Sequence, residues 1–276
     1  LTKTLEKMNK IKKENDFSKS SLTDLNNLPT FNGVCELRFK DNLFYMLNIG
    51  NDDSIPLKFF WRKNYENLAL SLWYEMTRNE GLFFDIGAHT GIYSIIGNLN
   101  KVQNNVISLE PYHLNFSRLI SNLKLNNIDT NSAYMRAASN ADGVDKLEIN
   151  TIQGYHTQGG KITGQGNYYI KKIRLDDLNL AKKVCGLKID TEGHEFEVIE
   201  GSKKIIEENK PDILIEINEG SFNSCISFLK KYDYKFYFLD EFSEKIINVE
   251  NFSDFLIQEE GTNCFATTKG IESFNL

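Results

Sequence analysis

The sequence has few of the features that mark fibrous, disulfide-stabilised or membrane-spanning proteins. Of its 276 residues, only four are proline and four are cysteine, and the cysteines form no CxxC pair. A collagen-like chain and a disulfide scaffold are therefore excluded, and we expect buried thiols in a reducing compartment. No apolar run approaches the about 18 residues of a membrane span. These absences indicate a soluble globular protein.

An excess of positive charge is also missing. The chain has 32 Lys and Arg against 38 Asp and Glu, which gives a net charge of -6. A broad surface for DNA or RNA is not expected with this balance. The Lys-rich N-terminal stretch lacks the apolar core of a signal peptide, so we expect a cytoplasmic location. The length suits one large domain, or a domain with a small cap.

Three regions follow one another along the chain. Residues 1–30 carry apolar side chains at helical spacing and predict a loosely attached helical lead-in. Residues 31–80 predict a cap, in which Cys35–Phe39 and Leu43–Ile49 form a β-hairpin and Tyr65–Arg78 forms an amphipathic helix. Residues 81–276 form the main domain, with an inserted hairpin and loop at 146–174.

The main domain alternates short apolar runs with helical patterns, which is typical of an α/β fold with a mostly parallel sheet and helices on both faces. The final run follows no helical pattern, so it is expected to be antiparallel at the edge of the sheet. We predict seven core strands, at Leu82–Ile86, Val106–Glu110, Ser132–Ala137, Leu187–Asp190, Ile213–Asn218, Lys235–Leu239 and Cys264–Thr268.

A Gly-rich turn after the first core strand is the strongest chemical signal. The strand ends in an acid, Asp85, and Gly87 and Gly91 allow a ligand to approach the backbone before a helix begins. This pattern is typical of a nucleotide-type cofactor loop. Its candidate cofactor-binding residues are Asp85, Gly87, Ala88, His89, Thr90, Gly91 and Ser94.

The second strand ends in another acid, Glu110, 19 positions after Gly91. A Rossmann unit places a ribose-binding acid at about this distance. Pro111 and Asn115 follow closely and belong to the same candidate pocket. The two features together leave a dinucleotide and S-adenosylmethionine open. The missing third glycine and Asp85, which would repel a pyrophosphate and attract an ammonium group, favour S-adenosylmethionine.

Several separated motifs resemble those of the FkbM-type S-adenosylmethionine-dependent methyltransferases. They are FDIGAHTGIYS, ISLEPYHLNFSRLISNLKLNN, IRLDDL and LKIDTEGHEFEVIEGSKKIIEENKPDILIEIN. The resemblance implies a Rossmann-like class I methyltransferase fold and methylation of a hydroxyl group. It implies that the methionine part lies over residues 85–91, the ribose on Glu110 and the adenine near Arg136, Ala137 and Ala138. The family pattern carries over to Asp85, Gly87, Gly91, Glu110, Asp190, Glu192, Gly193 and Glu195.

A base for the acceptor hydroxyl should lie at the carboxyl ends of the central strands, where ligands bind in open α/β sheets. The candidate catalytic residues there are Asp190, Glu192, His194, Glu216 and, in the inserted loop, His156. Asp190 is also a candidate cofactor ligand. Lys188 shares a strand face with Asp190 and is expected to pair with a carboxylate. No histidine pair has HxH or HxxxH spacing, so no metal site is expected.

The hypothesis from sequence is therefore an S-adenosylmethionine-dependent O-methyltransferase. Its expected partner is a small-molecule or glycan acceptor with a hydroxyl group, and a homodimer is left open. Two alternatives remain at this point. One is an NAD-dependent oxidoreductase, and the other is an S-adenosylmethionine-binding module without activity.

Overall fold

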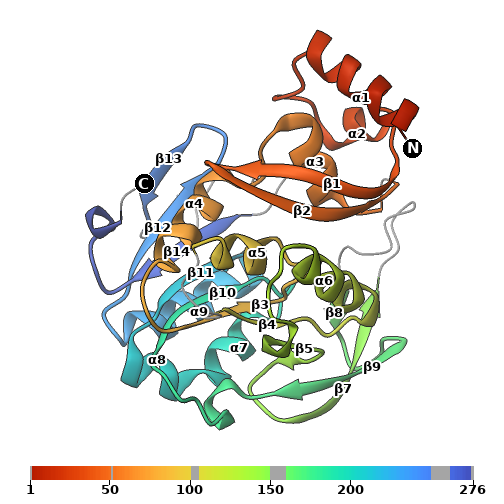
Figure 1. Cartoon of the computed structure of the whole chain (residues 1–276). Coiled ribbons are helices and arrows are strands. Elements are labelled where there is room, and N and C mark those ends of the chain that lie inside the picture. The colour runs from red at the N-terminus through yellow and green to blue at the C-terminus, as the bar shows by residue number, and fades with distance from the viewer. Residues whose placement is uncertain (1, 51, 101–105, 150–159, 250–261, 275–276) are drawn as a thin grey trace.

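The computed structural model describes every residue of the chain except 1, 51, 101–105, 150–159, 250–261 and 275–276. Figure 1 shows a large central sheet with helices on both faces. The chain before α4, residues 2–50 and 52–66, lies above one end of this sheet and is called the N-terminal segment below. The α-helices are α1 Thr2–Glu14, α2 Leu22–Asn26, α3 Ser54–Arg62, α4 Asn67–Met76, α5 Ile92–Asn98, α6 His113–Leu125, α7 Glu195–Gly201, α8 Lys203–Asn209 and α9 Glu219–Lys230.

Within the described parts of the chain, the central sheet contains eight strands in the order β13-β12-β14-β11-β10-β3-β4-β5. The five strands from β11 to β5 are mutually parallel, whereas β14 is antiparallel to both of its neighbours and β13 is antiparallel to β12. Their bounds are β3 Leu82–Ile86, β4 Val106–Leu109, β5 Ala133–Tyr134, β10 Val184–Ile189, β11 Asp212–Glu216, β12 Lys235–Asp240, β13 Lys245–Asn248 and β14 Asn263–Thr267.

Two details of this sheet correct the predictions from sequence. The sheet has eight strands rather than seven, and the final strand, β14, lies between β11 and β12 rather than at the edge. All five residues of β14 are buried, which suits an interior strand. The edge position belongs to β13, whose mostly exposed residues give no buried-strand signal in the sequence.

The predicted third strand, Ser132–Ala137, is divided between two sheets. Only Ala133–Tyr134 joins the central sheet as β5, while Ala137–Ala138 forms β6 of a separate four-stranded sheet. The other strands of that sheet are β7 Gly143–Ile149, β8 Gly160–Ile162 and β9 Tyr168–Ile173. They fall largely within the region where the sequence predicts an inserted hairpin.

The side chains of the central strands alternate between two hydrophobic clusters. On β3, Phe83 belongs to the cluster that contains α4, α5 and the N-terminal segment, and Phe84 belongs to the cluster that contains α7, α8 and α9. This alternation explains the apolar runs in the sequence, because each strand is buried on both faces. Helices therefore cover both faces, as predicted.

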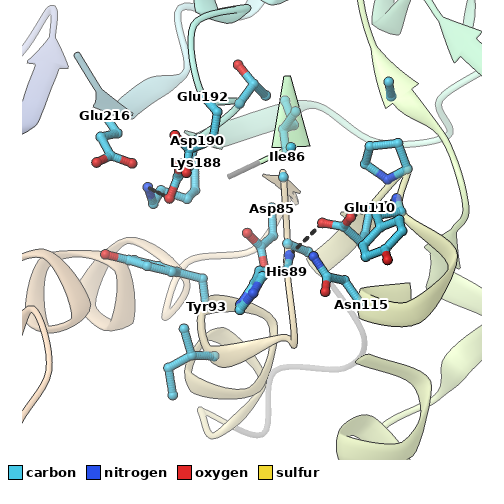
Figure 2. Close-up of a pocket in the computed structure, with 18 of the residues that line it drawn as sticks. Asp85, Ile86, His89, Tyr93, Glu110, Asn115, Lys188, Asp190, Glu192 and Glu216 are labelled. Atoms are coloured by element: carbon cyan, nitrogen blue, oxygen red, sulfur yellow. Dashed lines mark hydrogen bonds and ion pairs between the residues drawn. The ribbon is translucent and has the colours of Figure 1, made fainter. Parts of the chain in front are cut away.

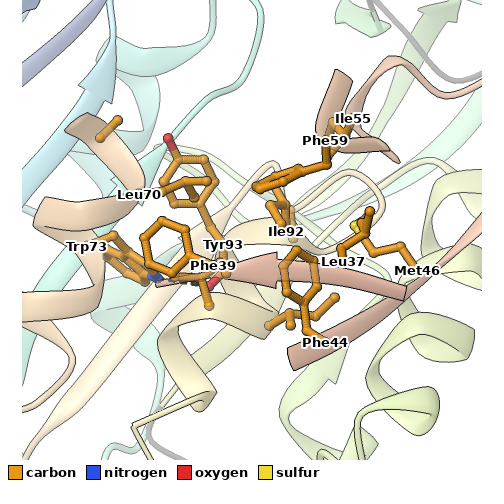
Figure 3. Close-up of a cluster of buried hydrophobic side chains, with 14 of the residues drawn as sticks. Leu37, Phe39, Phe44, Met46, Ile55, Phe59, Leu70, Trp73, Ile92 and Tyr93 are labelled. Atoms are coloured by element: carbon orange, nitrogen blue, oxygen red, sulfur yellow. Dashed lines mark hydrogen bonds between the residues drawn. The ribbon is translucent and has the colours of Figure 1, made fainter. Parts of the chain in front are cut away.

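The N-terminal segment packs its own hairpin against the main domain. Strands β1 Asn32–Phe39 and β2 Asn42–Ile49 form the antiparallel pair that the sequence predicts, with Phe39 opposite Asn42 at the turn. Figure 3 shows Phe44 of this hairpin facing Phe59 of α3, with ring centroids 5.4 Å apart. Met8 of α1 and Leu25 of α2 are buried in the same cluster.

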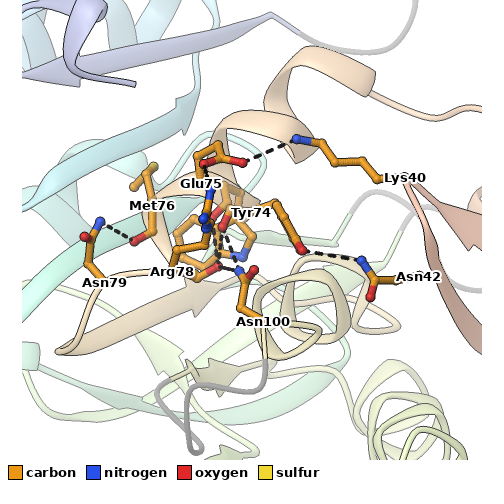
Figure 4. Close-up of polar contacts among 10 residues, drawn as sticks. Lys40, Asn42, Tyr74, Glu75, Met76, Arg78, Asn79 and Asn100 are labelled. Atoms are coloured by element: carbon orange, nitrogen blue, oxygen red, sulfur yellow. Dashed lines mark hydrogen bonds and ion pairs between the residues drawn. The ribbon is translucent and has the colours of Figure 1, made fainter. Parts of the chain in front are cut away.

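Helix α4 joins the hairpin to the main domain through both apolar and polar contacts. The buried Trp73 packs edge-on against Phe83 at 6.0 Å and donates from Nε1 to the carbonyl oxygen of Tyr93 at 2.9 Å. On the polar side, Figure 4 shows Glu75 between Lys40 and Arg78, at 3.5 and 2.8 Å. Trp73 thus attaches α4 to the main domain, and the Lys40–Glu75 pair attaches the hairpin to α4.

Four free cysteines are present, and the structure describes all of them. Cys35, Cys225 and Cys264 are buried and Cys185 is half-buried. Burial raises the pKa of the Cys35 and Cys264 thiols to about 12.

No helix among the described residues is long and apolar enough to cross a membrane.

Candidate functional site

A cavity of about 560 Å³ opens at the carboxyl ends of β3, β4, β10 and β11. The Gly-rich loop after β3 and the first residues after β4 line one side. The N-terminal segment closes another side through Leu22, Ser54, Ile55 and Lys58, and strands β7 and β8 contribute Leu147, Ile149 and Lys161. This is the position at which open α/β sheets bind ligands, and the volume suits a ligand of cofactor size.

The loop between β3 and α5 brings its backbone close to the neighbouring strands. Gly87 and Gly91 have φ angles of +76° and +100°, which favour glycine. The amide groups of Gly87 and Ala88 both donate to the carbonyl oxygen of Leu109, at 2.9 and 3.0 Å. A Cβ atom on Gly87 would lie only 1.7 Å from the carbonyl oxygen of Asp190. The loop thus has space for glycine alone at this position.

Asp85 lies at the base of the cavity, buried at the end of β3. Its Oδ2 accepts a hydrogen bond from the hydroxyl of Ser94 at 2.5 Å, and Ser94 is in turn 2.6 Å from the hydroxyl of Ser108. Burial raises the pKa of Asp85 to about 6, although Ser94 and Lys188 oppose the shift. Ser94 therefore holds the Asp85 carboxyl group by a hydrogen bond but does not itself line the cavity.

Glu110 lies beside the loop, immediately after β4, and is also buried. One carboxylate oxygen accepts from the amide of His89 at 2.9 Å (Figure 2). The other accepts from the amide of Tyr112 at 2.8 Å. Burial raises the pKa of Glu110 to about 8, even though both amides favour the charged form. The Glu110 carboxyl thus fixes the loop and faces the cavity beside Asn115.

A cluster of charged side chains occupies the opposite half of the cavity. Lys188 on β10 donates to Asp190 at 3.3 Å, which confirms the predicted pair. Burial opposes ionisation of Asp190, but Lys188 and a hydrogen bond with Glu216 lower its pKa below the ordinary value. Burial, together with the charge of Asp190, raises the pKa of Glu216 well above its ordinary value. The two shifts have opposite directions, so this environment favours the charged form at Asp190 and the neutral form at Glu216.

The family model of the methyltransferase FkbM domain matches residues 85–236, more than half of the chain. This chain belongs to the FkbM methyltransferase family. Comparison with curated proteins gives no match.

Solved structures with a similar arrangement are remote in sequence. Methyltransferase FkbM from Methylobacillus flagellatus is 16% identical, with a TM-score of 0.45 over 76% of this chain and 52% of that one. Precorrin-6y C5,15-methyltransferase from Geobacter metallireducens is 14% identical, with a TM-score of 0.42 over 74% and 88%. M. jannaschii TYW2, in complex with AdoMet, is 10% identical, with a TM-score of 0.39 over 87% and 89%. The match thus spans about half the length of the Methylobacillus protein.

Some residues that line the cavity are not among the predicted site residues, and two of them, Tyr65 and Glu66, precede the FkbM domain. Tyr65 and Glu66 line the cavity from the segment before α4, and Tyr93 lines it from α5. The Tyr93 hydroxyl donates to the Glu66 carboxylate, and its ring lies 4.8 Å from the Lys188 ammonium. Only the adjacency of Tyr93 to the Gly-rich loop is a signal in the sequence. No motif in the sequence around Glu66 distinguishes it from the other acidic residues of the chain.

The predicted site residues fall into three groups in the structure. Those that line the cavity are Asp85, Gly87, Ala88, His89, Glu110, Pro111, Asn115, Ala137, Ala138, Asp190, Glu192 and Glu216. Thr90, Gly91 and Ser94 belong to the same loop and helix but do not line the cavity. His156 lies outside the described residues.

His194 is also not among the residues that line the cavity. It precedes α7, where its Nε2 lies 3.0 Å from the Ser139 hydroxyl and its Nδ1 lies 3.6 Å from the Glu197 carboxylate. Among the described residues, no group of three or more His, Cys, Asp or Glu side chains is arranged to hold a metal ion.

Proposed function

We propose that this chain is an S-adenosylmethionine-dependent O-methyltransferase that acts on a hydroxyl group of a small-molecule or glycan acceptor. One observation carries the proposal: the Gly-rich loop and Glu110 face one half of a cavity whose other half contains Asp190, hydrogen-bonded to Lys188. The half of the cavity that would bind the cofactor thus lies next to the half that contains the proton-accepting residue. Membership of the FkbM family supports this reading.

The residues of the first half fit S-adenosylmethionine. Gly87 brings the backbone of the loop against that of Asp190, where a Cβ atom would lie 1.7 Å from the carbonyl oxygen. Glu110 offers two carboxyl oxygens at the end of β4, the place where Rossmann units bind ribose hydroxyls. Asp85 contributes a carboxyl group, which attracts a cationic ligand when ionised and repels a pyrophosphate. The lining therefore favours S-adenosylmethionine over NAD.

The bound cofactor supplies a methyl group on a positively charged sulfonium. The cavity's own residues hold the acceptor oxygen in line with that group and exclude water, which is the main source of acceleration in such transfers. Asp190 would accept the proton of the acceptor hydroxyl as its oxygen takes the methyl group, with the sulfur–carbon bond broken and S-adenosylhomocysteine as the leaving group. Proton removal by a positioned base contributes about 10²–10⁴-fold.

A methyl-transfer assay tests the proposal. The purified chain is incubated with S-adenosylmethionine labelled in its methyl group and a panel of sugars and hydroxylated small molecules, and labelled products are analysed by mass spectrometry and NMR. We expect an O-methyl ether. We expect Asp190→Asn to reduce turnover by about 10²–10⁴-fold, the usual contribution of a general base.

Asp145→Asn is the matched control, because Asp145 also pairs with a lysine, Lys172 at 2.9 Å, but does not line the cavity. This variant should retain the turnover of the wild type. Label on nitrogen or carbon, or equal turnover in Asp190→Asn and the wild type, would contradict the proposal.

A further inference from the structure

Lys188 is the most deeply buried cation of the cavity. Its side chain is 1% exposed, whereas that of its partner Asp190 is 30% exposed. The ammonium lies between the Asp190 carboxylate, at 3.3 Å, and the face of the Tyr93 ring, at 4.8 Å from the centroid. Figure 2 shows Lys188, Asp190 and Glu216 together on the side of Asp85 that is remote from Glu110.

Carboxyl groups from several elements surround this ammonium. Asp190 follows β10, Glu216 ends β11, Asp85 belongs to β3, and Glu66 precedes α4. Asp190 itself also faces His89 of the Gly-rich loop and interacts with its neighbour Glu192. Lys188 is nevertheless placed closest to one carboxyl group, because it shares the strand face of Asp190 two positions away.

We propose that Lys188 is the positioning residue that keeps Asp190 a carboxylate and leaves the shared proton of this carboxyl pair on Glu216. The inference rests on the proposed function, since it states how the base of that reaction is maintained. Two adjacent carboxyl groups that are both partly buried do not both ionise readily, so one of them retains a proton. Because the Lys188 ammonium contacts Asp190, it stabilises the charge on Asp190 and leaves the proton on Glu216.

The charges around the pair agree with this assignment. Burial disfavours the charged form of both carboxyls, yet the nearby ammonium and the hydrogen bond from Glu216 lower the pKa of Asp190, while the pKa of Glu216 is raised. Burial opposes the charge of Lys188 as well, but Asp190 and then Glu66 raise its pKa. The ammonium therefore stays charged throughout the pH range in which Asp190 would act.

Carbon-13 NMR of the carboxyl groups tests this inference without an acceptor. The full chain is labelled at the side-chain carboxyl carbons of Asp and Glu, and the two signals are assigned with Asp190→Asn and Glu216→Gln. Near pH 6 we expect the Asp190 signal of the wild type to be that of a carboxylate and the Glu216 signal to be that of a neutral acid. The reverse order would overturn the inference without any Lys188 variant.

Lys188→Met removes the charge but keeps an unbranched chain in the same space. Loss of an adjacent opposite charge should raise the pKa of Asp190 by about 1–3. Lys188→Arg, which keeps the charge, should restore the low value. A residue that only organised the sheet would leave the Asp190 titration unchanged in Lys188→Met, and this result would also overturn the inference.

Lys210→Met is the matched control, because Lys210 also places its ammonium over a tyrosine ring, Tyr232 at 5.0 Å, but does not line the cavity. It should leave the Asp190 titration as in the wild type. Titration of the same wild-type sample with S-adenosylhomocysteine separates the two claims. Absence of binding counts against the proposed function, whereas a misplaced proton in a protein that binds counts against the role of Lys188.

Discussion

Gly87 is the residue at which local geometry and ligand access are most tightly connected. A methyl side chain there would meet the Asp190 carbonyl oxygen at 1.7 Å, so the Gly-rich loop and the loop after β10 would have to separate. We predict that Gly87→Ala weakens S-adenosylhomocysteine binding at least about tenfold, which corresponds to 1.4 kcal/mol. Isothermal titration calorimetry measures this change.

Gly164→Ala provides a control for backbone strain alone. Gly164 has a φ angle of +70°, close to that of Gly87, but a Cβ atom there would find only Asp145 Oδ1, at 3.9 Å. Both substitutions should reduce stability by about 1 kcal/mol or more through strain. Only Gly87→Ala should affect binding, and an equal effect of both on affinity would count against the loop as the cofactor site.

Glu110 gives the site a pH dependence of predictable sign. Burial raises its pKa from 4.5 to about 8, so the folded protein retains a proton that the unfolded chain has lost. The contribution of this residue to the free energy of unfolding must then fall as pH rises from about 4.5 to 8. Glu110→Gln lacks this dependence.

Thermal unfolding of the wild type and Glu110→Gln between pH 5 and 8 tests this sign. We predict that the wild type loses stability relative to the variant as pH increases. Asp85, with a pKa raised to about 6, is present in both proteins and affects both curves. A difference in melting temperature that stays constant with pH would show that Glu110 is not perturbed in this way.

Among the elements, α6 connects the N-terminal hairpin to the Gly-rich loop. Asn122 is fully buried on this helix, where its Oδ1 accepts from the Leu47 amide and its Nδ2 donates to the Thr90 carbonyl, both at 2.8 Å. One turn later, Asn126 bonds both the amide and the carbonyl of Tyr45. The two asparagines thus satisfy backbone groups on the free side of β2.

We predict that Asn122→Leu, which fills a similar volume, lowers the free energy of unfolding by about 2 kcal/mol or more. Two backbone groups would lose their partners, and each such loss costs about 1–3 kcal/mol in a buried position. Urea denaturation measures the change. Asn131→Leu, at an exposed position, should change stability by less than about 0.5 kcal/mol. Equal effects of the two variants would contradict the role of Asn122.

The elements that sequence patterns predict well are those with strong periodicity. The hairpin of β1 and β2 and all the predicted core strands except the third lie where the apolar runs indicate. The position of β14 could not be predicted, because the order of strands depends on pairing across the sheet rather than on local pattern. Strand β13 was missed since its side chains are mostly exposed.

At the scale of the whole molecule, the site contains residues from the FkbM domain and from the N-terminal segment, which are separate regions of the sequence. The motifs of the FkbM domain locate Asp85, Glu110 and Asp190, because each lies in the last residues of a strand or directly after it, at the same edge of the sheet. Glu66 is brought to the same cavity only by packing of the N-terminal segment. The position of Glu66 in the cavity depends on tertiary contacts, and no spacing of residues in the sequence indicates it.

This arrangement assigns different roles to the two regions. In the proposed function, the FkbM domain supplies the cofactor half and the proton acceptor. The N-terminal segment lines the cavity with residues such as Ile55, Lys58 and Tyr65. Cofactor binding should therefore depend on the FkbM domain, and its affinity is the property on which the whole account rests.

The most direct test is isothermal titration of the purified wild-type chain with S-adenosylhomocysteine, with NAD titrated in parallel. The account predicts one site per chain with micromolar affinity for S-adenosylhomocysteine and no binding of NAD. Binding of NAD alone, or of neither compound, would contradict the claim that this cavity holds S-adenosylmethionine.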